Sequence, residues 1–264
     1  MELADVAAVR RRLDEVDYLV DEGTATAMFF ALTLGRPLLL EGEPGVGKTA
    51  AAKALAAALG TRLIRLQCYE GLTVGEALYE WNYQRQLLAI RHAGPQPPVL
   101  LIDEIDRADD EFEALLFEFL GESAITIPEI GTFTAARPPI VVLTSNRSRE
   151  LHDALRRRCL YHWIDFPAPP RAAEILRRTV PSANEPLISS TTQFIGRVRE
   201  LELDKPPGMA EAIDWLSALA LLGAGELVRD DVLRTLSTIA KTPDDRDTIT
   251  AALDELGYAG SARP

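Results

Sequence analysis

An apolar run, a glycine-rich bend and an alanine-rich stretch follow one another in "LLLEGEPGVGKTAAAKALAAALG", residues 38–60. The apolar run is typical of a buried strand, and the alanines and leucines after the bend favour a helix that Gly60 can end. Within the bend, Gly42, Gly47, Lys48 and Thr49 fit the pattern G-x-x-x-x-G-K-S/T in the strand-to-helix setting that the pattern requires. The sequence therefore predicts a phosphate-binding loop; the alternative is a glycine turn that fits by chance.

Each residue type in this loop has a chemical reason. Glycines let backbone N–H groups turn toward phosphate oxygens, and the positive end of the following helix adds to the attraction. Lys48 is expected to reach the β and γ phosphates of a nucleotide, and the Thr49 hydroxyl is expected to bind Mg²⁺. The residues that we expect to contact the nucleotide are Gly42, Glu43, Pro44, Gly45, Val46, Gly47, Lys48, Thr49 and Ala50.

Two acidic residues follow a second apolar run, in "VLLIDEIDRAD". Asp103 and Glu104 should lie at the carboxyl end of a strand, the edge at which open α/β sheets bind ligands. We expect Asp103 to hold Mg²⁺, directly or through water, and Glu104 to polarise the attacking water. Strand ends commonly carry solvated acids, so the nearby loop is what favours the catalytic interpretation.

Two further segments could complete such a site. "IVVLTSN" ends in Asn146, whose amide could bridge the γ phosphate and the water-activating carboxylate, or could simply form a turn. In "LHDALRRRCLYHWIDF", Arg156, Arg157 and Arg158 are adjacent. Such a cluster can be a solvated helix end, or it can supply a neighbouring subunit with an arginine that stabilises charge on the γ phosphate.

The alternation of apolar strands with helix-like stretches predicts an α/β fold with a parallel sheet. Past Phe166 comes a proline-rich stretch, and amphipathic helices are expected from Thr191 to Gly260. We therefore predict a core domain of residues 1–166 and a helical lid of residues 167–264. The predicted strands are Pro37–Gly42, Arg62–Cys68, Val99–Asp103, Ile140–Asn146 and Tyr161–Phe166.

Composition excludes several classes of protein. A formal net charge of −12 disfavours binding to a nucleic-acid backbone, although a local basic patch is compatible with it. Cys68 and Cys159 are the only cysteines, and their spacing, with three histidines, offers no zinc or redox motif, so both are expected to be buried thiols. No apolar run reaches the length of a membrane span and no secretory signal is visible, so we expect a cytoplasmic protein.

The order GEPGVGKT, LLIDEID, LTSN and ALRRRC, over residues 38–166, resembles an AAA+ ATPase. The whole chain is similar to MoxR-type members, and "YEWNY" and "PPIVVLTSNRSRELHDALRRRCLYHWIDFP" resemble the branch encoded near carbon monoxide dehydrogenase maturation genes. The resemblance implies a five-stranded P-loop core with a C-terminal α-helical lid, and ATP with Mg²⁺ bound between subunits of a ring, commonly a hexamer. It also implies chaperone-like remodelling of a client, plausibly a metalloenzyme, with a partner that carries a von Willebrand factor A domain.

The resemblance also assigns roles to residues. It places Tyr18–Gly23 against adenine, and it favours Arg158 as the finger that acts on a neighbouring subunit, with Arg156 and Arg157 kept as alternatives. The other implied roles are Walker A for Lys48 and Thr49, Walker B for Asp103 and Glu104, and sensor 1 for Asn146.

The chain departs from the family pattern in its second half and around its inserts. Where a sensor 2 arginine is usual, the matching position is Gly208, and Lys205 is a candidate substitute. The insert at Gly71–Pro98 looks short for this branch, whereas Ala124–Pro139 resembles a hairpin that either faces the ring pore or is an exposed decoration.

The tryptophans and one tyrosine raise a related question. Trp81 and Tyr83 could face the pore or anchor the core, whereas Trp163 and Trp215 are expected to be packing residues.

These observations predict a Mg²⁺-dependent ATPase in which Glu104 orients water and Lys48 neutralises charge. Two other functions stay open. A nucleotide-binding switch or scaffold would bind ATP with negligible hydrolysis, and a nucleic-acid-dependent ATPase would share every phosphate motif. The acidic composition disfavours the second.

Overall fold

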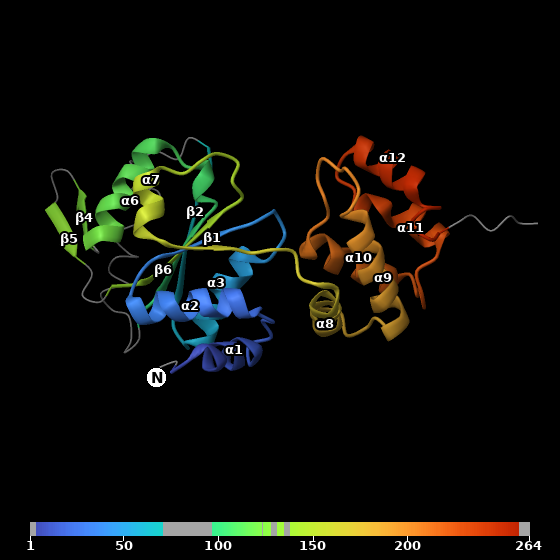
Figure 1. Ribbon diagram of the computed structural model, residues 1–264, viewed down its shortest axis with the longest axis horizontal. Helices are drawn as coiled ribbons and strands as arrows, with labels where there is room; N and C mark the ends of the chain where they lie inside the picture. Colours follow the sequence, from blue (N-terminus) through green and yellow to red (C-terminus); the bar gives the residue numbers. More distant parts are fainter. Residues whose placement is uncertain (1–3, 71–96, 123, 128–130, 135–137, 259–264) are drawn as a thin grey trace, which may run out of the picture. The chain divides into compact units, whose positions relative to one another are not determined.

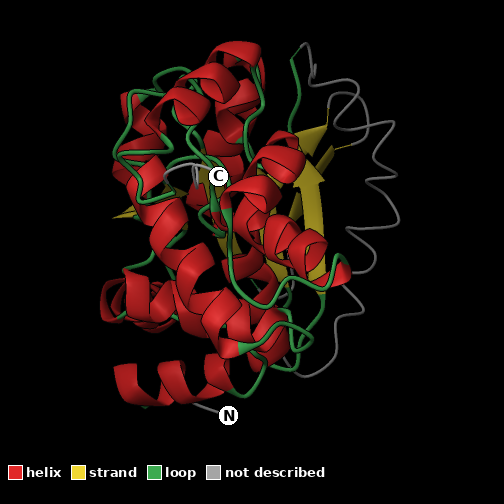
Figure 2. Ribbon diagram, turned by 90° about the vertical axis from the view of Figure 1, so that its right-hand side faces the viewer, coloured by secondary structure: helices red, strands yellow, loops and turns green. Residues whose placement is uncertain are grey.

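The computed structural model describes residues 4–70, 97–122, 124–127, 131–134 and 138–258. The chain forms two compact units, Met1–Glu43 with Lys48–Ile164, and Pro44–Gly47 with Asp165–Pro264. All strands of the described chain belong to the first unit. The described regular structure of the second unit is helical (Figures 1 and 2). The assignment of residues 1–166 as an ATPase core and residues 167–264 as a lid stays a prediction.

The first unit is built on a five-stranded sheet with the order β2-β3-β6-β1-β7, and every neighbouring pair in it is parallel. This confirms the predicted α/β fold with a five-stranded parallel sheet, although four of the strands are shorter than predicted. The strands are β1 (Leu38–Glu41), β2 (Leu63–Gln67), β3 (Val99–Asp103), β6 (Ile140–Ser145) and β7 (Leu160–Trp163).

Helices cover both faces of this sheet, which is why its strands are apolar along most of their length (Figure 1). On one face, α6 (Asp110–Glu122) and α7 (Asp153–Arg158) pack on a core to which Leu39, Ile102 and Leu143 contribute. The helices α1 (Val6–Asp14), α2 (Glu22–Leu34) and α3 (Lys48–Ala58) form the other helical layer.

Helix α3 follows the glycine-rich loop as predicted. It begins at Lys48 and ends at Ala58, and its alanines at 51, 52, 54, 56 and 58 are buried. Gly60 has φ +61°, the left-handed conformation that commonly ends a helix. Both the helix and its terminating glycine are therefore confirmed.

A hairpin precedes β6, as the sequence predicts. Its strands β4 (Ala124–Ile127) and β5 (Gly131–Thr134) pair antiparallel, with Ile125 opposite Phe133. Whether the hairpin faces a pore stays open. The other insert, with Trp81 and Tyr83, lies outside the described residues.

The second unit begins its helices earlier than predicted. Helix α8 (Pro169–Thr179) lies inside the proline-rich stretch, and α9 (Glu185–Val198) begins before the predicted Thr191. Proline in the first turn of a helix loses no hydrogen bond and has a suitable φ, so prolines here mark helix starts rather than breaks. The remaining helices are α10 (Met209–Leu221), α11 (Arg229–Thr235), the 3₁₀ turn η2 (Leu236–Thr238) and α12 (Pro243–Ala252).

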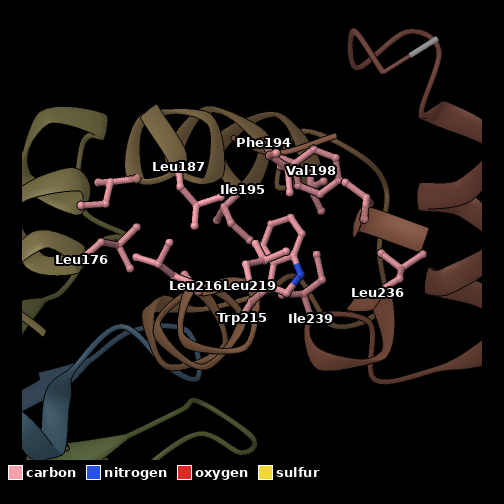
Figure 3. Close-up of a cluster of buried hydrophobic side chains, with 14 of the residues drawn as sticks. Leu176, Leu187, Phe194, Ile195, Val198, Trp215, Leu216, Leu219, Leu236 and Ile239 are labelled. Atoms are coloured by element: carbon pink, nitrogen blue, oxygen red, sulfur yellow. The ribbon is translucent and has the colours of Figure 1, made fainter. Parts of the chain in front are cut away.

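The second unit has its own apolar core, in which side chains of α9 and α10 point toward one another (Figure 3). Trp215 is fully buried, and its ring centroid lies 5.1 Å from that of Phe194. Its indole Nε1–H donates to the Thr235 hydroxyl at 2.7 Å. Trp215 is thus the packing residue that the sequence predicts. Trp163, in contrast, is only half-buried, and the Arg147 guanidinium lies 6.0 Å from its ring centroid.

Candidate functional site

Three of the predicted segments end at the same edge of the sheet. The glycine-rich loop leaves β1, Asp103 is the last residue of β3, and Asn146 directly follows β6. Since β6 lies between β3 and β1 and all three are parallel, their carboxyl ends are neighbours. The fold therefore brings together residues that are up to about a hundred positions apart in the sequence, at the edge where such sheets bind ligands.

Lys48 is held inside the loop that precedes it. Its side chain is buried, and Nζ donates to the carbonyl oxygens of Gly42 at 2.7 Å and Glu43 at 2.8 Å. Burial lowers the pKa of Lys48, while the charges of Asp106, Asp103 and other nearby carboxylates act in the opposite direction. A poorly hydrated ammonium group in this position is suited to a phosphate oxygen, since little water must be removed from it.

The backbone of the loop has the conformation that a phosphate cradle needs. Gly45 has φ +78° and Gly47 has φ +100°, backbone conformations that are unfavourable for residues with a Cβ atom. Backbone that alternates right- and left-handed conformations turns its N–H groups toward a common point, where an anion can bind. The conformation of the two glycines is compatible with the predicted phosphate-binding role, which stays a prediction.

Thr49 and Asp103 meet directly, as a shared Mg²⁺ site requires. The Thr49 hydroxyl lies 2.9 Å from Asp103 Oδ1 and 3.1 Å from Oδ2, and the Thr144 hydroxyl donates to Oδ1 at 2.5 Å. Hydroxyl and carboxylate oxygens suit Mg²⁺, which is usually bound by one or two carboxylates together with substrate phosphates. Among the residues that the structure describes, no cluster of three or more His, Cys, Asp or Glu offers an all-protein metal site. The donor set thus fits a nucleotide-bound Mg²⁺.

One partner of Asp103 was missed by sequence reasoning. Arg65, in the middle of β2, donates to Asp103 Oδ2 from Nε at 2.9 Å and from Nη2 at 2.5 Å. The only signal for it is a charged residue inside the strand "LIRLQ", which by itself is typical of a solvated strand face.

Glu104 is fixed by its backbone and by one arginine. It has φ +57°, a left-handed conformation that is uncommon outside glycine, and its N–H donates to the Thr144 hydroxyl at 2.9 Å. Its carboxylate forms an ion pair with Arg107, whose Nε lies 2.9 Å from Oε2, and about a third of the Glu104 side chain is exposed. A partly exposed carboxylate at this edge can reach a water molecule, as the predicted role requires.

Asn146 lies in a turn that a buried acid holds in place. Asp106 Oδ2 accepts from the N–H groups of Asn146 at 3.2 Å and Ser148 at 2.8 Å, and from the Ser148 hydroxyl at 2.6 Å. Between them, Arg147 has φ +58°. Asp106 was missed by sequence reasoning although it stands in the same "DEIDRAD" string as Asp103, because nothing in that string shows where its side chain points.

The three adjacent arginines lie in the last turn of α7, and all three are exposed. Arg158 donates to the Ala154 carbonyl at 3.1 Å and lies over the Phe117 ring, and Arg156 lies over the Tyr161 ring. Within the described chain, none of the three forms an ion pair with Asp103 or Glu104. The structure thus does not bring them to the Lys48 loop of the same chain.

Close packing explains why a glycine occupies position 208, which the family resemblance matches to sensor 2. Gly208 and the loop residues Pro44–Gly47 belong to the same compact unit. A Cβ at Gly208 would lie 2.7 Å from Gly45 Cα, and the Met209 N–H donates to the Gly45 carbonyl at 3.0 Å. No side chain fits position 208 with this backbone, so an arginine is excluded there. Lys205 is exposed, and its proposed substitution for that arginine stays a prediction.

The segment that the family resemblance places near adenine lines a cavity of about 380 Å³. Tyr18, Leu19 and Val20 line it together with residues of α1, among them Arg10 and Arg11. An adenine contact for Tyr18–Gly23 stays a prediction.

The cysteines take no part in this site. Cys68 and Cys159 are free and buried, and burial raises the pKa of each thiol to about 12. This confirms the prediction of buried thiols. None of the described helices is both long enough and apolar enough to span a membrane.

Comparison with known proteins agrees with this geometry. Residues 38–167 match the family model described as "ATPase family associated with various cellular activities (AAA)". The chain is 28% identical over 213 residues to "Chaperone MoxR1" of Mycobacterium tuberculosis, which covers 75% of this chain and 55% of that protein. It is 31% identical over 111 residues to "Uncharacterized protein YeaC" of Bacillus subtilis, covering 41% of this chain and 34% of that protein. The chain thus spans about half, or less, of these relatives.

Among solved structures, the fold is similar to that of RuvB from Thermotoga maritima. A RuvB mutant matches with a TM-score of 0.58 at 23% identity, covering 94% of this chain and 80% of that chain. A RuvB structure titled as a Holliday junction branch migration motor matches with a TM-score of 0.53 at 22% identity, covering 95% and 78%. At this identity the likeness concerns the fold.

Proposed function

The chain is an AAA+ ATPase of the MoxR type, and from this premise we propose that it hydrolyses ATP with Mg²⁺ and uses the energy to remodel a client protein. The observation that carries this proposal is the meeting of Thr49 with Asp103 beside the buried Lys48. Lys48 and Thr49 begin α3 and Asp103 ends β3, and together they supply the groups that bind a Mg²⁺–nucleotide.

The proposed roles follow from charge and reach. Lys48 neutralises negative charge on the β and γ phosphates, and the loop N–H groups bind and orient them. Thr49 and Asp103 would hold Mg²⁺, which supplies further charge neutralisation when bound. Glu104 orients the attacking water and accepts its proton, and Asn146 lies near the γ phosphate as sensor 1. The remaining groups that we expect to contact the nucleotide are Gly42, Glu43, Pro44, Gly45, Val46, Gly47 and Ala50.

Assembly is part of the proposal. Because Arg156, Arg157 and Arg158 are exposed and do not pair with the carboxylates of their own site, they are available to a neighbouring subunit. Arg158 is the proposed finger, and Arg156 and Arg157 are the alternatives. An arginine of this kind stabilises charge that develops on the γ phosphate.

The biological setting is proposed from family resemblance. We propose a hexameric ring, a partner with a von Willebrand factor A domain and a metalloenzyme client, as in the branch near carbon monoxide dehydrogenase maturation genes. The description of the M. tuberculosis relative as a chaperone supports a remodelling role. We propose a cytoplasmic location, because ATP is available there.

Two alternatives lead to different measurements. A nucleotide-binding switch would need Lys48 for binding, yet it would be insensitive to Glu104→Gln. A nucleic-acid-dependent ATPase would share the fold with RuvB, but the net charge of −12 disfavours it. Stimulation of hydrolysis by DNA, lost at higher salt, would support that alternative.

The test is the ATPase rate per protomer, measured against protein concentration with Mg²⁺ present and with Lys48→Ala as the blank. We expect the rate to rise steeply and then level off, because a site completed by a neighbour needs assembly. Adding Arg158→Ala protein to the wild type should lower the rate more than dilution does. The same mixture with Arg157→Ala tests the alternative finger, and Arg234→Ala, at an exposed arginine of the second unit, is the control. A rate equal to the blank at every concentration would contradict autonomous hydrolysis.

A further inference from the structure

We propose that Arg65 is a built-in counter-cation of Asp103 that Mg²⁺ must displace, so that Arg65 sets the Mg²⁺ concentration at which this chain binds its nucleotide. The inference rests on the proposed function, since it assumes that Asp103 binds nucleotide-bound Mg²⁺. It gives a role to a residue that neither the phosphate-binding loop nor the acidic strand end includes.

The geometry shows that Asp103 has no free acceptor position. Its Oδ1 accepts from the Thr49 and Thr144 hydroxyls, and its Oδ2 accepts from the Arg65 Nε and Nη2 groups, with the Thr49 hydroxyl 3.1 Å away. A carboxylate offers about four lone-pair positions. Since Asp103 is 2% exposed, a cation that binds it must replace one of these partners.

Arg65 is the partner that can leave. The Arg65 side chain is 44% exposed, whereas Thr144 is fully buried and Thr49 is itself an expected Mg²⁺ ligand. A released guanidinium can be hydrated, and it keeps a second partner, because Nη2 also donates to Gln67 Oε1 on the same strand. Gln67 thus already contacts the guanidinium group at Asp103, and it is a partner that the group can keep when it leaves the carboxylate.

Charge makes the two cations exclude each other. A guanidinium group and Mg²⁺ on one carboxylate would repel each other, and near a buried carboxylate this repulsion is much stronger than in water. In the absence of metal, Arg65 lowers the cost of burying the Asp103 charge. The same contact opposes metal binding, because two charge-assisted hydrogen bonds must break first.

The experiment measures binding, independently of hydrolysis. The full chain is titrated with Mg²⁺ at a fixed concentration of a fluorescent ATP analogue, and the Mg²⁺ midpoint is compared between wild type, Arg65→Gln and Arg65→Lys. Arg62→Gln removes the same charge at an exposed residue just before β2 and is the matched control. Thermal unfolding of each protein without ligand shows that the variants are folded.

We expect Arg65→Gln to lower the Mg²⁺ midpoint about tenfold or more, the size of effect for losing hydrogen bonds to a charged group. The Mg²⁺ midpoint of Arg65→Lys should lie between those of the wild type and Arg65→Gln, because lysine keeps the charge but not the paired donors. The midpoint of Arg62→Gln should match that of the wild type. A Mg²⁺ midpoint that is unchanged or raised in Arg65→Gln would overturn the proposal. If Arg65→Gln is unfolded, the same result in Arg65→Lys would overturn it. A wild-type protein whose nucleotide binding is absent or insensitive to Mg²⁺ would instead overturn the proposed function.

Discussion

The two units differ in how many charged side chains they bury. Of the six Asp, Glu and Lys side chains that are buried in the described chain, the first unit holds Glu41, Lys48, Asp103, Asp106 and Glu113, and the second holds Asp245 alone. Both units bury an apolar cluster, and that of the second unit surrounds Trp215 and Phe194 (Figure 3).

Burying a charge costs stability unless it is paired, so a concentration of buried charges indicates where a fold serves chemistry rather than its own stability. Here that place is the carboxyl edge of the sheet. The one buried acid of the second unit has a structural role, since Asp245 accepts from the backbone N–H groups of Asp204 and Lys205. The contrast predicts that substitutions in the core of the second unit will lower stability, whereas substitutions at the carboxyl edge of the first unit's sheet will lower activity.

The largest effect is expected in the apolar core. Trp215→Ala removes a fully buried ring and leaves the Thr235 hydroxyl without its donor, so it should lower the free energy of unfolding by about 3–5 kcal/mol. Denaturant unfolding followed by circular dichroism measures this. Leu221→Ala, at a side chain that is 88% exposed, is the control and should change stability little. A loss below about 1 kcal/mol for Trp215→Ala would contradict the assignment of this ring to a stabilising core.

Glu104→Gln should lower activity and leave stability unchanged. Loss of a general base typically lowers the rate about 100-fold or more, equivalent to about 2.7 kcal/mol of transition-state stabilisation. The variant should still bind nucleotide and unfold like the wild type, because Glu104 is partly exposed. ATPase rates and nucleotide binding are measured side by side, with Glu150→Gln as an exposed acid of the same unit for comparison. A silent Glu104→Gln would favour the nucleotide-binding switch.

The same substitution at two buried acids tests the contrast directly. Asp106→Asn and Asp245→Asn each remove a buried charge that accepts backbone hydrogen bonds, so each should lower the free energy of unfolding by about 2 kcal/mol. Only Asp106→Asn should also lower the ATPase rate, because Asp106 anchors the turn that carries Asn146. If Asp106→Asn and Asp245→Asn lowered the ATPase rate equally, measured well below the unfolding transition, the two units would not divide catalysis from stability.

The smallest effect concerns Lys48 and pH. Its pKa is lowered in the folded chain by burial, so the folded state binds this proton less tightly than the unfolded chain does. The destabilising contribution of Lys48 is therefore largest at pH values below its folded pKa, and it is relieved as the pH rises toward the unfolded value.

Denaturant unfolding of wild type and Lys48→Met across alkaline pH tests this sign. Lys48→Met should be the more stable protein near neutral pH, and its advantage should shrink as the pH rises. Lys53→Met, at an exposed position of the same helix, controls for loss of charge. An advantage that grows with pH would contradict the role of burial.

The parts of the site that the sequence predicted are those in which one local segment carries the whole signal. The loop from Gly42 to Thr49 needs only its own glycines and the elements on either side, and α3 needs only its alanines. The contacts of Arg65, Thr144 and Asp106 depend on which strands are neighbours and on their register, for example Gln67 opposite Asp103. No local pattern contains that information. Helix α8 was missed for a different reason, because its prolines favoured a break when they in fact begin the helix.

The Met209 N–H donates to the Gly45 carbonyl, so hydrogen–deuterium exchange at this amide is a site-specific probe of the loop. An amide proton exchanges with deuterium from the solvent only when its hydrogen bond opens. The Met209 amide is the first of α10, and its acceptor lies on the glycine-rich loop instead of in its own helix. The uptake of deuterium at this single amide therefore reports how often the loop carbonyl separates from it, and a nucleotide that rearranges the loop would be recorded there as a changed exchange rate.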